Sequence, residues 1–361
     1  MRYILLEVTT TRPLVTVLTP VYNGEAYLAQ CIESVRAQTY DHWEYVIVNN
    51  ASRDRTGEIV GRYAALDRRI RVFTNEQLVP VVQNHNIALR HISPASQWCK
   101  FVSADDLLLS ECLERMVAHG EAHPSVGLIS AYQLHGAQVG LAGLPYPSPV
   151  VPGRAVARES LLGLVRVFGN PTSHMIRADL VRSRDPFYDE SNIHADEAAC
   201  YEVLRTSDLG FVHQVLTYNR SHPGSITFTV ARRLNTYLPA HIKMLTTYGP
   251  IYLTPVEFDH VLKLRMDAYY TFLARVLLTS ARRENWEYHR NALRELGFPL
   301  SRGRLARSLL RQLGQVLASP GTELPKVFRL IRPRRDDESG WRYWWAPTGF
   351  EAAGSDRDVT P

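Results

Sequence analysis

The sequence has few cysteines, and none of them stands in a pattern that would build a covalent or metal-bound framework. The four cysteines, Cys31, Cys99, Cys112 and Cys200, show no CxxC spacing. This predicts neither a disulfide scaffold nor a structural zinc site, and it favours a reducing compartment. No window reaches the roughly 18 apolar residues of a membrane-spanning helix. The first residues, MRYILLEVTTT, hold only a short apolar run broken by Glu7, so we predict no signal peptide and a cytoplasmic location.

A large excess of one charge is also lacking. Lys and Arg number 41 against 36 Asp and Glu, a net charge of +5, which gives no reason to predict a nucleic-acid partner. No G-x-G-x-x-G follows the first apolar run, and this disfavours a dinucleotide-dependent oxidoreductase. A Gly-rich loop containing Arg and Lys is missing there too, which disfavours a nucleotidyltransferase. What is present is 361 residues, 45% of them hydrophobic, enough for two domains.

Apolar, β-branched runs alternate with helical periodicity over the first 120 or so residues. Strands are predicted at 14–19, 45–49, 70–74 and 98–103, and helices at 26–37, 56–66, 82–90 and 110–119. Such alternation predicts a parallel, doubly wound sheet. Ligands of these sheets bind beyond the carboxyl ends of the strands, which here carry Thr19–Asn23, Asn49–Asp54 and Ser103–Asp106.

The alternating pattern loosens after residue 130. Residues 140–153 are rich in Pro and Gly and are predicted to form a long loop, which would be either a lid or a plain insertion. A helix is predicted at 155–168, and strands at 174–177 and 210–220. From Ala231 to about residue 319 the periodicity is helical, and the tail at 331–361 is predicted to be disordered.

Two adjacent carboxylates stand at the end of the fourth predicted strand. Ser103-Ala104-Asp105-Asp106 follows that strand directly. One or two carboxylates together with substrate phosphates are the usual ligands of Mg²⁺, and Mn²⁺ accepts the same oxygen donors. An Asp at the start of the following helix would equally serve to cap that helix. The pair alone leaves both interpretations open.

Two later motifs carry further polar side chains. Asp196-Glu197 precedes a predicted helix, where the acids would either complement the helix N-terminus or supply a general base to a hydroxyl nucleophile. Arg220 ends the last predicted strand, His222 follows it, and both are candidates for binding phosphate or metal. The competing interpretation of His222 is an ordinary surface residue.

Taken together, these motifs resemble the N-terminal half of a family 2 glycosyltransferase with the GT-A fold. The similarity covers residues 14 to about 119 through TPVYNGEAYLAQCIESVRAQTY, VIVNNASRDRT and FVSADDLLLSECLERM. It continues more weakly through PTSHMIR, HADEAACYEVL and YNRSHPGS to about residue 227. The resemblance implies a GT-A-type α/β fold with a doubly wound, mostly parallel sheet. It also implies a catalytic domain at 1–230, with a nucleotide-sugar half at about 14–119 and an acceptor half at about 120–230, and then a helical region at 231–330.

The resemblance implies a nucleotide-sugar site along the strand ends. The end of the first strand, Pro20 with Tyr22, would pack against the base. Relatives carry Asp pairs after the second strand to read a pyrimidine, and here those positions are Asn49 and Asn50. An amide oxygen still accepts a hydrogen bond from N3–H of uracil or thymine, but the amide also donates and carries no charge. Asp54 matches the later Asp of the same motif. Asn84 matches a polar residue that helps to shape the nucleotide site in many relatives.

The resemblance also assigns the acids to separate tasks. Asp105 and Asp106 match the DXD-type motif that binds ribose and the metal-bound diphosphate, although Ser103 stands where many relatives have a third Asp. Asp196 matches the catalytic base, and His222 matches a C-terminal His that approaches the diphosphate or metal. The implied reaction is inverting transfer from a UDP or dTDP sugar, with Mg²⁺ or Mn²⁺, to a saccharide or lipid-linked acceptor in cell-surface polysaccharide synthesis. The remaining alternative is a non-catalytic carbohydrate-binding or scaffold protein derived from the same fold.

The C-terminal helical region is basic between Arg302 and Arg335 and contains an apolar stripe. The basic residues are Arg302, Arg304, Arg307, Arg311, Lys326, Arg329, Arg332, Arg334 and Arg335, and the stripe is Leu305, Leu309, Leu310, Leu313 and Val316. Such a helix would dock peripherally on the inner face of an anionic membrane. The alternative is a helix packed on its neighbours with a solvated basic face. The aromatic WRYWW at 341–345 fits either an interfacial anchor or a packed tail.

Overall fold

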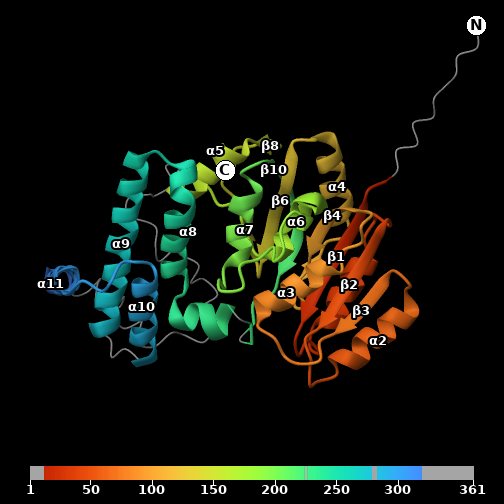
Figure 1. The fold of residues 1–361 in the computed structure, drawn as a ribbon, viewed down its shortest axis with the longest axis horizontal. Coiled ribbons are helices and arrows are strands. Elements are labelled where there is room, and N and C mark those ends of the chain that lie inside the picture. Colours follow the sequence, from red (N-terminus) through yellow and green to blue (C-terminus); the bar gives the residue numbers. More distant parts are fainter. Residues whose placement is uncertain (1–11, 223, 226, 279–282, 319–361) are drawn as a thin grey trace, which may run out of the picture. The chain divides into compact units, whose positions relative to one another are not determined.

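The structure is a computed structural model that describes residues 12–222, 224–225, 227–278 and 283–318 (Figure 1). The chain divides into two compact units. The first comprises Met1–Ser160 and Leu164–Ser221, and the second comprises Leu161–Gly163 and His222–Pro361. The division of tasks predicted for residues 1–230 and 231–330 stays a prediction. The predicted disordered tail and WRYWW lie outside the described residues.

The first unit is organised around one ten-stranded sheet with the order β3-β2-β1-β4-β9-β6-β10-β5, in which β7 pairs with β6 and β8 with β10 (Figure 1). Its strands are β1 (Leu14–Val21), β2 (Trp43–Asn49), β3 (Ile70–Thr74), β4 (Ser96–Phe101), β5 (Leu107–Leu108), β6 (Val126–His135), β7 (Gln138–Gly140), β8 (Val150–Val151), β9 (His174–Arg177) and β10 (Asp208–Asn219).

Parallel pairing dominates the sheet. Strands β3, β2, β1 and β4 pair parallel in succession, as do β6 and β10, whereas β9 pairs antiparallel with both β4 and β6. The prediction of a mostly parallel, doubly wound sheet is confirmed. The register sets Val21 of β1 beside Asn49 of β2, so the carboxyl ends of these strands lie at one edge. The short strands β5, β7 and β8 were not expected, because two or three residues carry no measurable periodicity.

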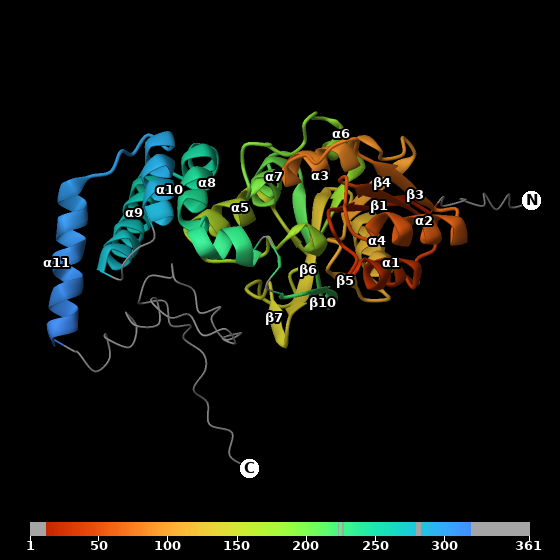
Figure 2. The same ribbon diagram turned by 90° about the horizontal axis from the view of Figure 1, so that it is seen from below.

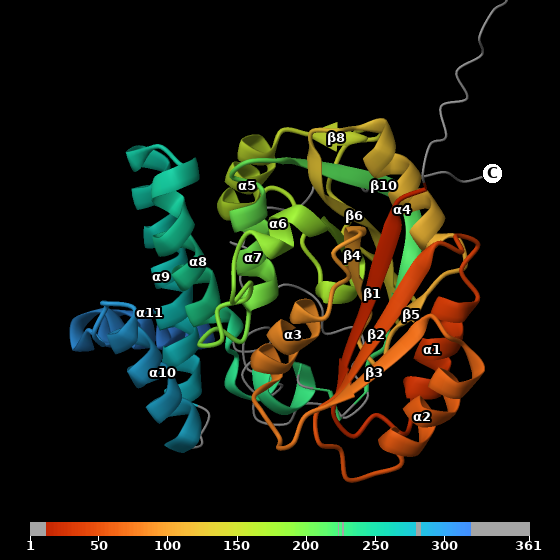
Figure 3. The same ribbon diagram turned by 45° about the vertical axis from the view of Figure 1, so that its right-hand side comes forward.

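Helices cover both faces of this sheet. Helices α1 (Leu28–Arg36), α2 (Thr56–Leu66) and α4 (Cys112–Ala122) supply residues to one buried apolar cluster. Helices α3 (Val81–Arg90), α5 (Gly153–Leu162), α6 (Ala178–Arg182) and α7 (Ala195–Val203) supply residues to the other. Figure 3 shows α1 and α2 on one side of β1–β3 and α3 on the opposite side. The two covered faces explain why β1 and β2 are buried along most of their length, without alternation between buried and exposed residues.

The second unit is helical, as predicted for the C-terminal region. It contains α8 (Tyr237–Tyr252), α9 (Pro255–Leu278), α10 (Arg283–Glu295) and α11 (Arg302–Ala318) (Figure 2). Helix α9 contacts both α8 and α11, and α10 contacts α8. A separate apolar cluster that includes Tyr269, Leu273 and Leu293 holds them together. Within the described ranges, we found no helix with the length and apolar character needed to cross a bilayer.

Candidate active site

The acidic pair lies in the turn between β4 and β5, where Asp106 is almost completely buried at 2% exposure. Its Oδ2 accepts hydrogen bonds from the Thr172 hydroxyl at 2.6 Å and from Asn170 Nδ2 at 2.8 Å. Its Oδ1 accepts one from the backbone N–H of Arg220 at 2.9 Å. Asp105 is partly exposed beside it. The structure therefore brings a turn, a strand end and the acidic pair together at one point.

The charge of one carboxylate in this pair affects the pKa of the other. Burial and the neighbouring charge of Asp105 raise the pKa of Asp106 to about 7, although the hydrogen bonds from Thr172, Arg220 and Asn170 act to lower it. Two carboxylates side by side resist simultaneous ionisation. A cation placed between them would relieve that repulsion, so the pair is arranged to receive positive charge.

Arg220 closes over the acidic pair from the end of β10. Besides its backbone bond to Asp106, its Nε donates to the carbonyl of Asp105 at 2.9 Å and its Nη2 donates to Gln30 Oε1 at 2.8 Å. The guanidinium carbon also stands 4.5 Å from the ring centroid of Tyr27, within cation–π range. These contacts fix the guanidinium beside the acids. The predicted role of Arg220 in binding the donor's phosphates stays a prediction.

A buried lysine supports the turn that carries Asn170 and Thr172. Lys100 of β4 is fully buried, and its ammonium donates to the carbonyl of Thr172 and, at 3.1 Å, to that of His174. Burial lowers the pKa of Lys100, while the charge of Asp106 acts to raise it. The lysine thus satisfies two carbonyls of the turn whose side chains hold Asp106.

The amides of the second strand end are buried and internally bonded. Asn49 and Asn50 are 6% and 3% exposed, and Asn84 of α3 is 3% exposed. Asn75, which follows β3, donates from Nδ2 to Oδ1 of both Asn50 and Asn84 at 2.9 Å. The structure brings these predicted site residues together and joins them through Asn75, which the sequence analysis did not single out.

The other predicted nucleotide residues lie near this edge, in β1 or on the loops that follow β1 and β2. Asp54 accepts from the Glu25 backbone N–H at 2.9 Å and from the hydroxyl and N–H of Thr56 at 2.5 and 3.0 Å. Burial acts to raise the pKa of Asp54, but these bonds outweigh it, and the pKa is lowered overall. Asp54 therefore fixes the loop after β1 to the start of α2. Pro20 is partly buried in β1, and Tyr22 is 44% exposed, which leaves the Tyr22 ring accessible.

Asp196 stands in the first turn of α7 and is partly buried. Burial raises the pKa of its carboxyl to about 6, and the backbone N–H groups of Glu197 and Asp196 act in the opposite direction. The segment before α7 is held to α3 by Asn86, whose Oδ1 accepts from the N–H of Tyr188 and whose Nδ2 donates to its carbonyl, both at 2.9 Å. Asp196 is thus a carboxyl whose pKa lies near the working pH of an enzyme.

His222 belongs to the second unit, and its predicted contact with diphosphate or metal stays a prediction. Four residues that hold the site together were not predicted: Asn75, Lys100, Asn170 and Thr172. Three of them carried a usable signal. Asn75 follows the third strand directly, and Asn170-Pro171-Thr172 is a turn sequence directly before a strand. Lys100 carried none, because a lysine inside a strand is ordinarily exposed.

The donor atoms at the acidic pair fit a divalent cation that is shared with a phosphate. Across the described ranges no three side chains of His, Cys, Asp or Glu gather into a metal cage. Asp105 and Asp106 supply two carboxylates, and the buried Oδ1 of Asn170, which is bonded to Asp106 through its Nδ2, has no hydrogen-bond partner. Mg²⁺ is commonly held by one or two carboxylates with phosphate oxygens and water rather than by a full protein cage. The residues present match that mode.

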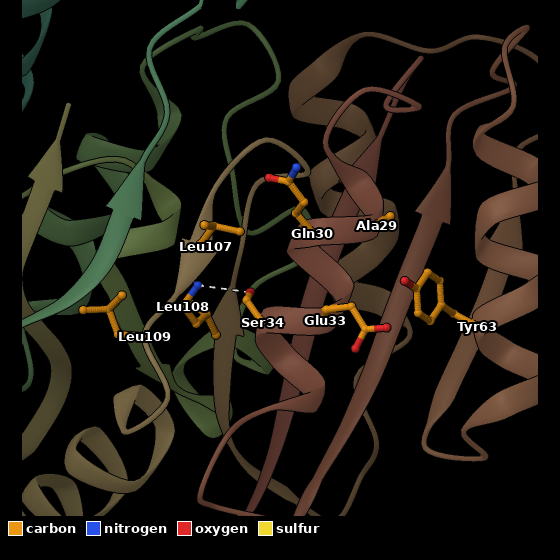
Figure 4. A pocket seen from close by; sticks show the side chains of 8 residues that line it. All are labelled: Ala29, Gln30, Glu33, Ser34, Tyr63, Leu107, Leu108 and Leu109. Atoms are coloured by element: carbon orange, nitrogen blue, oxygen red, sulfur yellow. Dashed lines mark hydrogen bonds between the residues drawn. The ribbon is translucent and has the colours of Figure 1, made fainter.

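A separate pocket of about 460 Å³ lies along α1 and β5 (Figure 4). Its wall combines apolar side chains such as Ala29, Leu107 and Leu109 with Gln30 and Glu33. Gln30 is its link to the acidic pair, through the bond from Arg220. None of the predicted site residues lines this pocket, so it is distinct from the acidic site.

Comparison with known proteins shows similarity to glycosyltransferases. Residues 16–183 match the family described as Glycosyl transferase family 2. TuaG of Bacillus subtilis, which carries the name of a teichuronic acid biosynthesis glycosyltransferase, is 33% identical over 109 residues, covering 30% of this chain and 42% of TuaG. The chain spans 13% to 42% of the length of the first four curated relatives that it matches.

Two solved structures share the fold at low sequence identity. S. aureus TarS 1–349 in complex with UDP-GlcNAc aligns with a TM-score of 0.60 at 17% identity, covering 88% of this chain and 90% of TarS. The mannosyltransferase PcManGT from Pyrobaculum calidifontis, in complex with GDP-Man and Mn²⁺, aligns with a TM-score of 0.53 at 16% identity, covering 88% and 84%. The fold is therefore that of GT-A glycosyltransferases. Residues 16–183 of the chain are similar to glycosyltransferase family 2.

Proposed function

We propose that this chain is an inverting, metal-dependent glycosyltransferase that moves a sugar from a nucleoside-diphosphate sugar to a hydroxyl of a saccharide or lipid-linked acceptor. The similarity of residues 16–183 to this family supports the reaction class. The arrangement of Asp105, Asp106 and Arg220 supports a diphosphate-binding role. The resemblance indicates UDP or dTDP as the nucleotide, and TuaG suggests a cell-surface polysaccharide as the product.

On this proposal, the donor's diphosphate lies against the acidic pair and Arg220. As the bond to the sugar breaks, the leaving diphosphate gains negative charge, which the Arg220 guanidinium stabilises electrostatically. A divalent cation held by Asp105 and Asp106 would add Lewis-acid stabilisation of the same charge. Asn170 and Thr172 hold Asp106 in place, and Lys100 holds their turn.

Asp196 acts as the general base on the acceptor hydroxyl; its match to the catalytic base of the resembled family supports this assignment, and the environment of its carboxyl supports it as well. Its carboxyl has a pKa of about 6 because it is buried. A base of that pKa is ionised at neutral pH and still basic enough to take a proton efficiently. A single displacement assisted by one base inverts the anomeric centre, unlike hydrolysis by a pair of carboxylates that flank the bond.

Helix α11 is the surface proposed to meet a membrane that carries a lipid-linked acceptor. Leu310, Leu313 and Leu317 are 70%, 45% and 82% exposed, and the side chains of Arg307 and Arg311 are exposed on the same helix. Leu305 and Leu309 instead pack into the core of the second unit, so only part of the predicted stripe is available. Exposed Leu beside Arg is the composition of an interfacial helix, which would place the chain on the inner face of the membrane.

The reaction is tested with the full chain, Mn²⁺ and a panel of nucleotide sugars, by measuring release of nucleoside diphosphate with and without acceptor saccharides. Asp196→Asn should lower transfer by about 10²- to 10⁴-fold and leave donor binding intact. Glu197→Gln, which neutralises the adjacent carboxylate of the same helix turn, is the matched control and should retain most of the activity. Full transfer by Asp196→Asn would refute the assigned base.

A further inference from the structure

The amides at the ends of β2 and β3, together with one amide of α3, form a connected group that we call the amide cluster: Asn49, Asn50, Asn75 and Asn84. Three of them are at most 6% exposed, so each of these amides must place its oxygen and its nitrogen against suitable protein partners. A buried amide presents a donor at one end and an acceptor at the other. The group that stays unbonded, donor or acceptor, determines which kind of base the cluster can bind.

Backbone groups determine the orientation of Asn50. The N–H of Val79 donates to Asn50 Oδ1 at 3.0 Å, and Asn50 Nδ2 donates to the carbonyl of Val79 at 2.9 Å. A backbone N–H only donates and a backbone carbonyl only accepts. The Asn50 amide therefore cannot be turned over without placing like groups against each other at both ends.

The orientation of Asn50 determines the orientations of Asn75 and Asn84. Because Asn50 presents its oxygen to Asn75, the Asn75 atom 2.9 Å away must be Nδ2. The same nitrogen stands 2.9 Å from Asn84, which must therefore present Oδ1 to it. Asn49 follows the same rule independently, since its Oδ1 accepts from the backbone N–H of Ser52 at 3.1 Å.

The capacity that remains at Asn50 is that of a donor. Its Oδ1 already accepts two hydrogen bonds, from Val79 and Asn75, and a carbonyl oxygen has two lone pairs. Its Nδ2 keeps one hydrogen after donating to Val79. At Asn84, the part of the chain that the structure describes supplies no acceptor for Nδ2, and Oδ1 accepts one bond, from Asn75. Asn50, which stands at a position where relatives read the base, therefore has an N–H group to offer and no acceptor.

We propose that the amide cluster selects a base whose pairing-edge ring nitrogen carries no hydrogen, which among pyrimidines is cytosine. Uracil and thymine carry N3–H, which needs an acceptor that Asn50 does not have free. Cytosine offers N3 and O2 as acceptors for the N–H groups of Asn50 and Asn84. The proposal rests on the proposed function, in which this strand edge binds the donor nucleotide, and it replaces the UDP or dTDP that the resemblance indicates with a cytidine donor.

The test compares CDP with UDP by isothermal titration of the full chain with Mn²⁺ in excess, with ADP and GDP as a second matched pair. We expect CDP to bind at least tenfold more tightly than UDP, and ADP more tightly than GDP. Equal affinities, or tighter binding of UDP, would overturn the proposal and leave the glycosyltransferase intact. Failure of all four nucleotides to bind would overturn the proposed function itself.

Asn84→Asp separates base reading from the fold of the cluster. The carboxylate still accepts the bond from Asn75, but it replaces the N–H groups of Asn84 with an acceptor. We expect the ratio of CDP to UDP affinity to fall by about tenfold, as an interaction of about 1.4 kcal/mol would give. Gln83→Glu adds the same charge one residue earlier on α3, outside the amide cluster, and should leave the ratio unchanged. An unchanged ratio in Asn84→Asp, with melting temperature preserved, would also refute the proposal.

Discussion

The hydroxyl of Thr172 donates a hydrogen bond to Oδ2 of Asp106 across 2.6 Å. The same hydroxyl oxygen accepts the backbone N–H of Ser103 at 3.0 Å. One side chain from the turn before β9 thus holds both ends of the segment that carries the acidic pair. The geometry of the proposed diphosphate site consequently depends on a residue that has no charge.

Thr172→Val should lower the free energy of unfolding by about 1–3 kcal/mol, because it leaves a buried carboxylate with one donor fewer and the Ser103 N–H without its acceptor. Urea denaturation measures this loss. Donor affinity should fall as well, since Asp106 is no longer held in place. Thr172→Ser keeps the hydroxyl and is the matched control. If the Val variant matched the Ser variant in both stability and donor affinity, the bond would have no positioning role.

Asp196 should give the enzyme an acidic limb in its pH profile. The base acts only when ionised, so kcat/KM should rise with pH through an apparent pKa near 6, the value to which burial raises this carboxyl. Measurement of initial rates from pH 4.5 to 8 with a fixed donor tests this. In Glu197→Gln the limb should stay where it is. A rate that does not change across pH 6 would contradict the assignment of Asp196.

The same carboxyl should make the folded state less stable as pH rises. Its pKa in the folded chain, about 6, lies above the ordinary 3.8, so the folded state holds the proton more tightly than the unfolded chain does. Stability conferred by the protonated form is therefore lost between about pH 4 and pH 6. Asp196→Asn should accordingly raise the free energy of unfolding by about 1–2 kcal/mol at pH 7.5 and have little effect at pH 3.5. Stabilisation that was equal at both values would indicate packing rather than charge.

The strand pattern and the acids could be read from the sequence because both are local. Largely apolar runs followed by Asn49-Asn50 or Asp105-Asp106 appear within a few residues, and a parallel sheet necessarily sets such strand ends at one edge. The helix at 56–66 was predicted with its observed bounds, Thr56–Leu66. The helix predicted at 155–168 instead ends at Leu162, because periodicity specifies a helix better than it specifies its last turn.

The partners of these acids and amides could not be read from the sequence, because they come from distant segments. Thr172 is 66 residues from Asp106 in the chain, and only the antiparallel placement of β9 beside β4 brings them together. The polarity of Asn50 likewise depends on Val79, which is 29 residues away. The residue types show which donor and acceptor groups are present. The tertiary contacts determine which of those groups remain free for a ligand.

Lys100→Met tests the support beneath the acidic site. Methionine is of similar length, so the main loss is the ammonium that donates to the carbonyls of Thr172 and His174. Two buried carbonyls left without a donor should cost about 2–4 kcal/mol of unfolding free energy. Lys263→Met, which removes an exposed lysine of α9, is the control and should change it by less than about 0.5 kcal/mol. Equal effects of the two variants would show that Lys100 gives its turn no support.

The proposed membrane surface predicts binding of the full chain to vesicles rich in anionic phosphatidylglycerol. Replacing Leu310, Leu313 and Leu317 with Gln should weaken co-sedimentation with these vesicles by at least tenfold. Partial burial of each leucine in the interface would contribute about 1 kcal/mol, less than the full transfer of a leucine side chain. The three residues are exposed, so the melting temperature of the variant should not fall.

The control for this experiment distinguishes insertion of the leucine side chains into the bilayer from attraction of the arginines to anionic headgroups. Arg307→Gln with Arg311→Gln should reduce the preference for anionic over phosphatidylcholine vesicles, since each basic residue near the surface contributes about 1 kcal/mol. The leucine variant should instead weaken binding to both kinds of vesicle, because apolar insertion does not depend on headgroup charge. Unchanged binding in both variants would mean that α11 presents a solvated basic face, and a lipid-linked acceptor would then have to reach the enzyme by another surface.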